Sequence, residues 1–157
     1  MNTERLDRVV IYVKNIEKSK ALYSDLLGID FDEIPFADVD PVTMLPGGED
    51  SAPPLEGADV GPPGNWRVAI SRAGLELIEG ALEPGADPYV ACYHFKVQDY
   101  EGAKAEMAAK GIPLNADITL GKLREAIYQP QGDDGPLMGL VSYPDEYVMD
   151  SIKTKGR

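Results

Sequence analysis

The chain contains two stretches in which apolar and polar residues alternate and a helical pattern follows. In the first stretch, one face of the alternation carries Val9, Ile11 and Val13, and the other carries Arg8, Val10 and Tyr12. This alternation predicts a strand with one face against helices and the other face turned elsewhere. The following apolar residues recur at helical spacing between Asn15, a candidate N-cap, and Gly28, the residue type expected just past a helix end.

A shift of 84 residues superposes the second stretch on the first. The shift pairs Val13 with Val97, Glu17 with Glu101, Lys20 with Lys104 and Ala21 with Ala105. Asp99 is the candidate N-cap of the second helix, and Gly111 is its expected stop. The sequence therefore predicts a duplicated unit.

Further strands are expected after each helix. In the first half they lie at residues 29–36, 67–71 and 75–79, the last two forming a hairpin, and in the second half at 118–120, 126–128, 138–142 and 147–152. Each half then has roughly the order β-α-β-β-β. We expect an α+β protein with one module at residues 5–82 and another at 88–153, which together form one domain.

A Pro/Gly-rich, acidic insertion interrupts the first module at residues 35–64. It contains seven prolines and five glycines, too many for a core element. Two interpretations stay open, a mobile surface insertion and a lid over a pocket. Between Asp25 and Asp59 there are ten acidic residues and no lysine or arginine, which favours cationic ligands or simply solubility.

Composition excludes several classes of function. The 157 residues carry a formal net charge of −12, which disfavours nucleic acid and anionic membrane surfaces as partners. No apolar run approaches the roughly 20 residues of a membrane span, and no secretory signal is evident, so we expect a cytoplasmic protein. The only histidine, His94, cannot supply the two imidazoles of common iron or zinc centres, and the only cysteine, Cys92, cannot form an internal disulfide.

Four segments resemble the vicinal oxygen chelate superfamily, which includes glyoxalase I, methylmalonyl-CoA epimerase, extradiol dioxygenases and bleomycin-resistance proteins. They read LDRVVIYVKNIEKSKALYSDLLGIDF, GLELIE, CYHFKVQDYEGAKAEMAAKGI and SYPDEYVMD. The resemblance implies a cupped mixed sheet around one cavity, formed by the two modules, and a homodimer that binds a small molecule. The superfamily shares this architecture across several chemistries.

The resemblance also implies four metal-ligand positions, which fall here on Arg8, Glu76, Cys92 and Asp150. Only Glu76 is the residue type that the superfamily uses. A guanidinium has no lone pair to donate and repels a divalent cation, so we expect neither the usual metal nor another cofactor. A displaced metal site formed by Glu76, His94 and Asp150 remains an alternative by strand parity.

Each candidate site residue has two interpretations. Glu76 and His94 are the candidate catalytic bases, although a strand histidine is more often simply hydrogen-bonded. Arg8 either clamps an anionic ligand or forms an internal ion pair with Glu76 or Asp150. Tyr12 is a cavity wall or a hydrogen-bond donor, and Cys92 is a buried apolar residue unless His94 turns toward it and activates it.

These residues lead to one functional hypothesis and two alternatives. The leading hypothesis is a protein that binds or processes a small carbonyl or carboxylate compound, as a metal-independent isomerase or lyase. The first alternative is a non-catalytic protein that sequesters a cationic organic ligand. The second is a metal-dependent enzyme with the displaced site.

Overall fold

The computed structural model describes residues 1–36, 43–46, 65–130 and 135–152. The first half contains β1 (Thr3–Val13), α1 (Ile16–Leu27), β2 (Phe31–Glu33), β3 (Thr43–Pro46), β4 (Arg67–Ser71) and β5 (Leu75–Glu79). The second half contains β6 (Tyr89–Val97), α2 (Tyr100–Ala109), β7 (Leu114–Leu120), β8 (Leu123–Tyr128), β9 (Leu137–Ser142) and α3 (Val148–Ile152).

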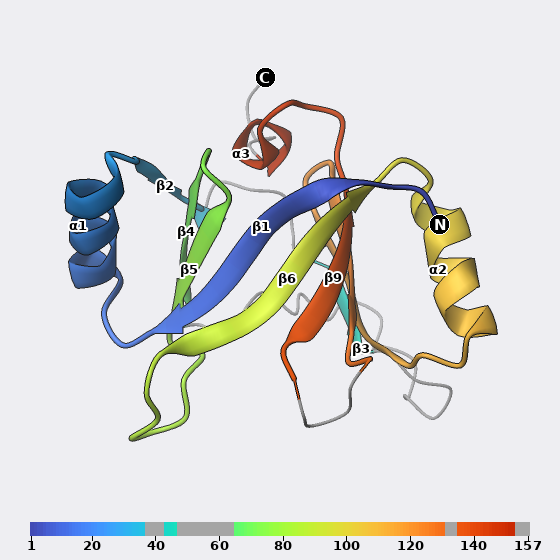
Figure 1. Ribbon diagram of the computed structural model, residues 1–157, viewed down its shortest axis with the longest axis horizontal. Coiled ribbons are helices and arrows are strands. Elements are labelled where there is room, and N and C mark those ends of the chain that lie inside the picture. The colour runs from blue at the N-terminus through green and yellow to red at the C-terminus, as the bar shows by residue number, and fades with distance from the viewer. Residues whose placement is uncertain (37–42, 47–64, 131–134, 153–157) are drawn as a thin grey trace.

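All strands of the described residues join one curled mixed sheet in the order β2-β4-β5-β1-β6-β9-β8-β7-β3. The series β2-β4-β5-β1 in the first half has the same arrangement as β7-β8-β9-β6 in the second. The two series meet at the antiparallel pair of β1 and β6, which crosses the centre of Figure 1. The predicted α+β architecture, two repeated units in one curled sheet, is confirmed.

The pairing of β1 with β6 fits the internal repeat residue by residue. Arg8 lies opposite His94 and Val10 lies opposite Cys92. In the internal repeat, a shift of 84 residues relates Arg8 to Cys92 and Val10 to His94. The repeat therefore maps the pair Arg8–His94 onto the pair Cys92–Val10. This is the register expected of two copies related by an approximate twofold axis between the central strands.

The two longer helices begin where the sequence predicts. The Asn15 side chain accepts a hydrogen bond from the backbone N–H of Lys18, and Gly28 ends α1 in the left-handed conformation. Asp99 caps α2 in the same manner through the N–H of Gly102. Both helices therefore have the boundaries that local capping chemistry dictates.

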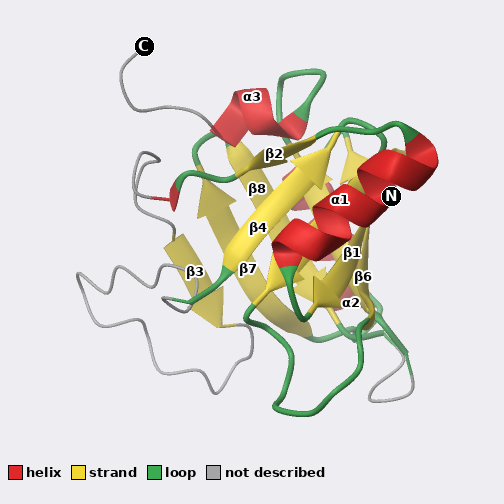
Figure 2. Ribbon diagram, turned by 90° about the vertical axis from the view of Figure 1, so that its left-hand side faces the viewer, coloured by secondary structure: helices red, strands yellow, loops and turns green. Residues whose placement is uncertain are grey.

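The two longer helices lie on the outer face of the sheet and leave the concave face to the site. α1 packs on β4 and β5, and α2 packs on β9, at opposite ends of the molecule in Figure 1. Figure 2 shows α1 in front of the strands that it covers. Separate apolar clusters lie under the two helices, centred on Leu77 and Leu140. A third cluster, which includes Val10, Ile70 and Met149, lies inside the curl of the sheet.

Two elements differ from the sequence prediction. The expected strand at residues 147–152 is wrong, because the last strand ends at Ser142 and the chain then forms α3. The buried Val148, Met149 and Ile152 follow helical spacing, and they close one end of the curled sheet. The insertion at residues 35–64 lies mostly outside the described residues, but its short strand β3 pairs with β7 at the sheet edge.

No helix in the described part of the chain has the length and apolar character needed to cross a membrane.

Candidate functional site

A cavity of about 250 Å³ lies on the concave face of the sheet. Its wall is mainly apolar and comes from both halves of the chain. The lining includes Val10, Ile34, Phe36, Trp66, Val68, Ile70, Ile78, Ala116, Ile118, Leu120, Leu123, Ile127, Leu137 and Ile152. Arg8, Glu76, His94 and Glu125 also line it and form a buried polar cluster, which we call the floor cluster. A small organic molecule with few polar atoms matches such a cavity.

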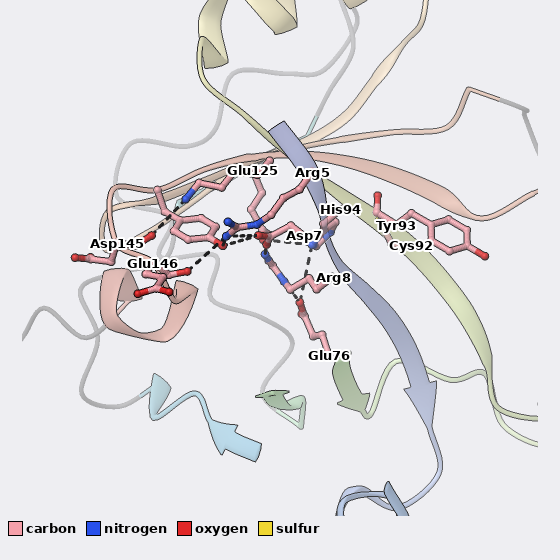
Figure 3. Close-up of polar contacts among 12 residues, drawn as sticks. Arg5, Asp7, Arg8, Glu76, Cys92, Tyr93, His94, Glu125, Asp145 and Glu146 are labelled. Atoms are coloured by element: carbon pink, nitrogen blue, oxygen red, sulfur yellow. Dashed lines mark hydrogen bonds and ion pairs between the residues drawn. The ribbon is translucent and has the colours of Figure 1, made fainter. Parts of the chain in front are cut away.

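Arg8 is the centre of the floor cluster. Its Nε donates a hydrogen bond to Oε2 of Glu76 at 2.5 Å, and its Nη2 donates to Oε1 of Glu125. Its Nη1 donates to Oδ2 of the neighbouring Asp7 at 2.7 Å. Figure 3 shows the guanidinium among these carboxylates. Arg8 is only 3% exposed, and its buried charge is compensated by three ion pairs. The internal ion pair with Glu76 is one of these three.

Opposing effects set the pKa of Arg8. Burial disfavours the charged guanidinium, but the carboxylates of Glu76, Glu125 and Asp7 outweigh burial and raise the pKa of Arg8 above its ordinary value. Arg8 is therefore a permanent cation that is already shared by three carboxylates. This arrangement leaves little of its charge for an anionic ligand.

Glu125 is the functional candidate that the sequence analysis missed. Burial raises the pKa of Glu125 to about 7, although Arg8 lowers it, and the nearby Glu76 adds to the rise. The residue lies on β8 between Leu123 and Ile127, which line the same cavity. The sequence signal that could have identified Glu125 is a single acidic residue between the apolar, inward-facing positions of this strand.

His94 lies across the central strand pair from Arg8 and faces the same two glutamates. Its Nδ1 is 3.7 Å from Oε1 of Glu125 and 3.9 Å from Oε2 of Glu76. Burial, followed by the charge of Arg8, lowers the pKa of His94 well below its ordinary value. The imidazole is therefore neutral at physiological pH, and its role as a catalytic base stays a prediction.

The strand register corrects the placement of Asp150. Val10 is paired with Glu76 in the first half, and its counterpart His94 is paired with Gly139 in the second half. The counterpart of Glu76 is therefore Gly139. Asp150 instead lies on α3, where its side chain is 53% exposed and near Arg72. The predicted contribution of Asp150 to the cavity is wrong because the chain leaves the sheet before reaching it.

Tyr12 and Cys92 line the cavity, as strand parity predicts. Tyr12 stacks edge-on with Tyr89 and is tilted against Trp66, and burial raises its pKa to about 12. Burial first, and then the charges of Glu125 and Glu76, raise the pKa of the Cys92 thiol. The thiol is therefore protonated, as expected of a buried apolar residue.

The floor cluster does not fit the divalent metal that the resemblance implies. Arg8 donates to both Glu76 and Glu125, so their oxygens are directed toward a guanidinium. In the described part of the chain, no three His, Cys, Asp or Glu side chains are arranged to hold a metal ion. The displaced site through Asp150 is also wrong, since that side chain lies outside the cavity.

Solved structures with the same fold include several epimerases. Methylmalonyl-CoA epimerase from Mycobacterium tuberculosis aligns with a TM-score of 0.61 and 15% identity, over 92% of this chain and 91% of that one. A variant of the Streptomyces coelicolor methylmalonyl-CoA epimerase, in complex with 2-nitronate-propionyl-CoA, gives 0.61 and 16%, over 92% and 100%. A hypothetical protein from Bacillus halodurans gives 0.59 and 15%, over 90% and 95%. At these identities the likeness concerns the fold.

The family assignment comes from the sequence. None of the curated proteins matches this chain. The model of the Glyoxalase/Bleomycin resistance protein/Dioxygenase superfamily matches residues 5–137, which cover the first repeated unit and the second as far as the start of β9. The match agrees with the duplicated fold and with the cavity between its halves. The chain belongs to the Glyoxalase/Bleomycin resistance protein/Dioxygenase superfamily.

Proposed function

We propose that this protein transfers a proton, without a metal ion, at the carbon next to the carbonyl group of a small, uncharged organic compound. The observation that carries the proposal is the convergence of two carboxylates, one guanidinium and one neutral imidazole on an apolar cavity. The four polar side chains are buried, so each acts more strongly than it would on the surface.

Glu125 is the group that we expect to take and return the proton. A general base works best when its pKa is near the working pH, and the pKa of Glu125 is about 7. In the proposed step, the ionised carboxylate removes a proton from carbon, and the electron pair of that C–H bond forms an enolate. The Glu125 carboxyl exchanges its proton with solvent, and return of a proton from Glu125 to carbon regenerates the carboxylate. Arg8 holds Glu76 and Glu125 in place throughout.

The charge of the floor cluster argues for an uncharged substrate. Arg8 faces Glu76, Glu125 and Asp7, so acidic side chains outnumber the only guanidinium among them. A substrate carboxylate would therefore meet net negative charge in a low-dielectric cavity. This argument favours the carbonyl compounds of the sequence hypothesis over the carboxylates, and it weakens the proposal that Arg8 clamps an anion.

The likeness to epimerases supports the reaction class. Epimerisation beside a carbonyl group is a proton transfer at carbon, and the neighbouring structures carry that name. Their named ligand is a CoA derivative, whereas the cavity of about 250 Å³ and its apolar wall favour a smaller acyl or aryl ketone here. The support is for the chemistry rather than for a shared substrate.

Exchange of carbon-bound protons in D2O tests the proposal. Acetophenone and 2-hydroxyacetophenone are suitable uncharged probes, and ¹H NMR follows the loss of the protons next to the carbonyl. We expect the protein to accelerate exchange above the buffer rate, and Glu125→Gln to reduce that acceleration by about 100-fold or more. The exposed Glu83→Gln is the matched control and should behave as wild type. Binding without any acceleration would refute proton transfer.

One observation favours the alternative of a non-catalytic binder of cationic organic compounds. The same excess of carboxylates that disfavours an anion would attract an ammonium group. This alternative predicts that benzylammonium raises the melting temperature and that benzyl alcohol does not. Proton exchange in 2-hydroxyacetophenone would then equal the buffer rate.

A further inference from the structure

The floor cluster contains one polar atom whose hydrogen-bonding capacity is unused. Nδ1 of His94 is the only buried side-chain nitrogen or oxygen without a hydrogen-bond partner in the described part of the chain. The His94 side chain is 5% exposed and lines the cavity. Buried polar atoms are normally paired, because an unpaired one loses its hydration without compensation. An unpaired atom at a cavity wall therefore points to a ligand atom as its partner.

The surroundings of Nδ1 suit one ligand atom. Oε1 of Glu125 at 3.7 Å and Oε2 of Glu76 at 3.9 Å are too far for a direct hydrogen bond with Nδ1. A single oxygen placed beside Nδ1 could, however, lie within hydrogen-bond distance of both Nδ1 and a carboxylate. The three groups come from β6, β5 and β8, so the sheet itself fixes their spacing.

Gly139 leaves room for the imidazole in this orientation. A Cβ atom built on Gly139 would overlap the Cδ2 and Nε2 edge of the His94 ring. The backbone of Gly139 does not have a positive φ, so glycine serves here to provide space and not to permit an unusual conformation. The Cδ2 and Nε2 edge of the ring therefore lies against Gly139 on β9, and Nδ1 lies near the glutamates.

The charge state of these groups selects the chemistry of the ligand atom. The neutral imidazole offers one donor or one acceptor at Nδ1, while a carboxylate oxygen only accepts. A hydroxyl group matches this set, since it accepts from Nδ1–H and donates to a carboxylate. A carboxylate cannot donate a hydrogen bond, a methyl group can neither donate nor accept one, and an ammonium cannot accept one from Nδ1–H.

We propose that His94 Nδ1, with Glu76 and Glu125, forms a subsite for a hydroxyl group, so that the ligand class is a small hydroxylated carbonyl compound. The inference rests on the proposed function for the carbonyl part, but the hydroxyl subsite can be tested by binding alone. His94 is a specificity-determining residue in this arrangement, and Gly139 is a positioning residue behind it.

The test is a matched series of probes that differ in one group on the same benzyl frame. Benzyl alcohol, ethylbenzene, phenylacetate and benzylammonium present a hydroxyl, a methyl, a carboxylate and an ammonium at nearly the same place. Ligand-observed NMR titration gives Kd for each. We expect benzyl alcohol to bind about tenfold more tightly than ethylbenzene, the effect of one buried hydrogen bond. Benzylammonium should bind less tightly than benzyl alcohol, and phenylacetate should bind most weakly.

Three variants distinguish the hydrogen bond from simple packing. His94→Phe keeps a ring but has no nitrogen, and it should reduce the preference for benzyl alcohol over ethylbenzene to about twofold or less. His94→Asn places an amide near the position of Nδ1 and should restore part of the preference. Gly139→Ala removes no polar atom, yet it should reduce the preference by displacing the ring. Circular dichroism and melting temperature confirm that each variant is folded.

The outcomes separate the subsite from the proposed reaction. An equal preference for benzyl alcohol in wild type and a folded His94→Phe would overturn the subsite. Tightest binding by benzylammonium would also overturn it and favour the cation binder. A His94-dependent preference together with no proton exchange would support the subsite and refute proton transfer, whereas exchange without the preference would do the reverse.

Discussion

Replacement of Arg8 by methionine is the most direct test of how the floor cluster is held together. The change removes the guanidinium that donates to Glu76, Glu125 and Asp7 and leaves an apolar side chain of similar length. Removing one partner of a buried ion pair leaves the other charge unpaired in a low-dielectric environment. At pH 8 we expect Arg8→Met to lose about 3–5 kcal/mol of the free energy of unfolding.

The loss should depend on pH in a defined direction. The pKa of Glu125 rises from an ordinary 4.5 to about 7 on folding, so its contribution to stability is present below pH 4.5 and is lost as the pH rises through 7. A shift of this size corresponds to a cost of about 3 kcal/mol for ionising Glu125 in the native protein. Without Arg8 that cost increases, so the destabilisation at pH 5 should be smaller than at pH 8 by at least about 1 kcal/mol.

Urea unfolding at pH 5 and pH 8 provides the measurement. Trp66 is the only tryptophan and lines the cavity, so its fluorescence should report the unfolding transition. The exposed Arg72→Met is the matched control, since its guanidinium is 3.6 Å from Asp150 at the surface and should contribute about 1 kcal/mol or less. A loss in Arg8→Met that equals the control, or that is the same at both pH values, would refute the role of Arg8 as the counter-charge.

Four further predictions follow from the same geometry. His94 is neutral when buried, so protonation of the unfolded chain below pH 6.5 should lower the stability of the wild type relative to His94→Phe, and urea titrations of both proteins at pH 5.5 and 7 should show this relative loss at pH 5.5. Burial and the raised pKa of Cys92 should make its reaction with a thiol reagent at pH 8 at least about 100-fold slower in the native protein than in urea, and a rate equal to the unfolded rate would contradict its placement. Elemental analysis of protein purified without added metal should find no stoichiometric divalent ion, and an ion bound through Glu76 and Glu125 would contradict the role assigned to Arg8. Light scattering should find the dimer that the family resemblance implies, and a monomer at micromolar concentration would refute it.

Most of the site was accessible from the sequence because strand parity is a local property. The alternation in β1 and β6 placed Arg8, Tyr12, Cys92 and His94 on one face, and all four line the cavity. The internal repeat then related the two central strands, and capping residues marked both helices. Each of these features depends on residues that are near one another in the chain or on a constant shift between two copies.

The composition of the floor cluster depended on long-range pairing that no local pattern contains. Glu125 meets Arg8 only because β8 and β9 continue the sheet beyond β6, and the alternation in β8 does not specify which charge it will face. Gly139 rather than Asp150 became the counterpart of Glu76 because the register of β6 with β9 sets that position. The sequence by itself determined the repeat, the helix boundaries and the inward faces. The tertiary structure alone decided that three carboxylates share one guanidinium, because burial and ion pairing depend on which strands meet.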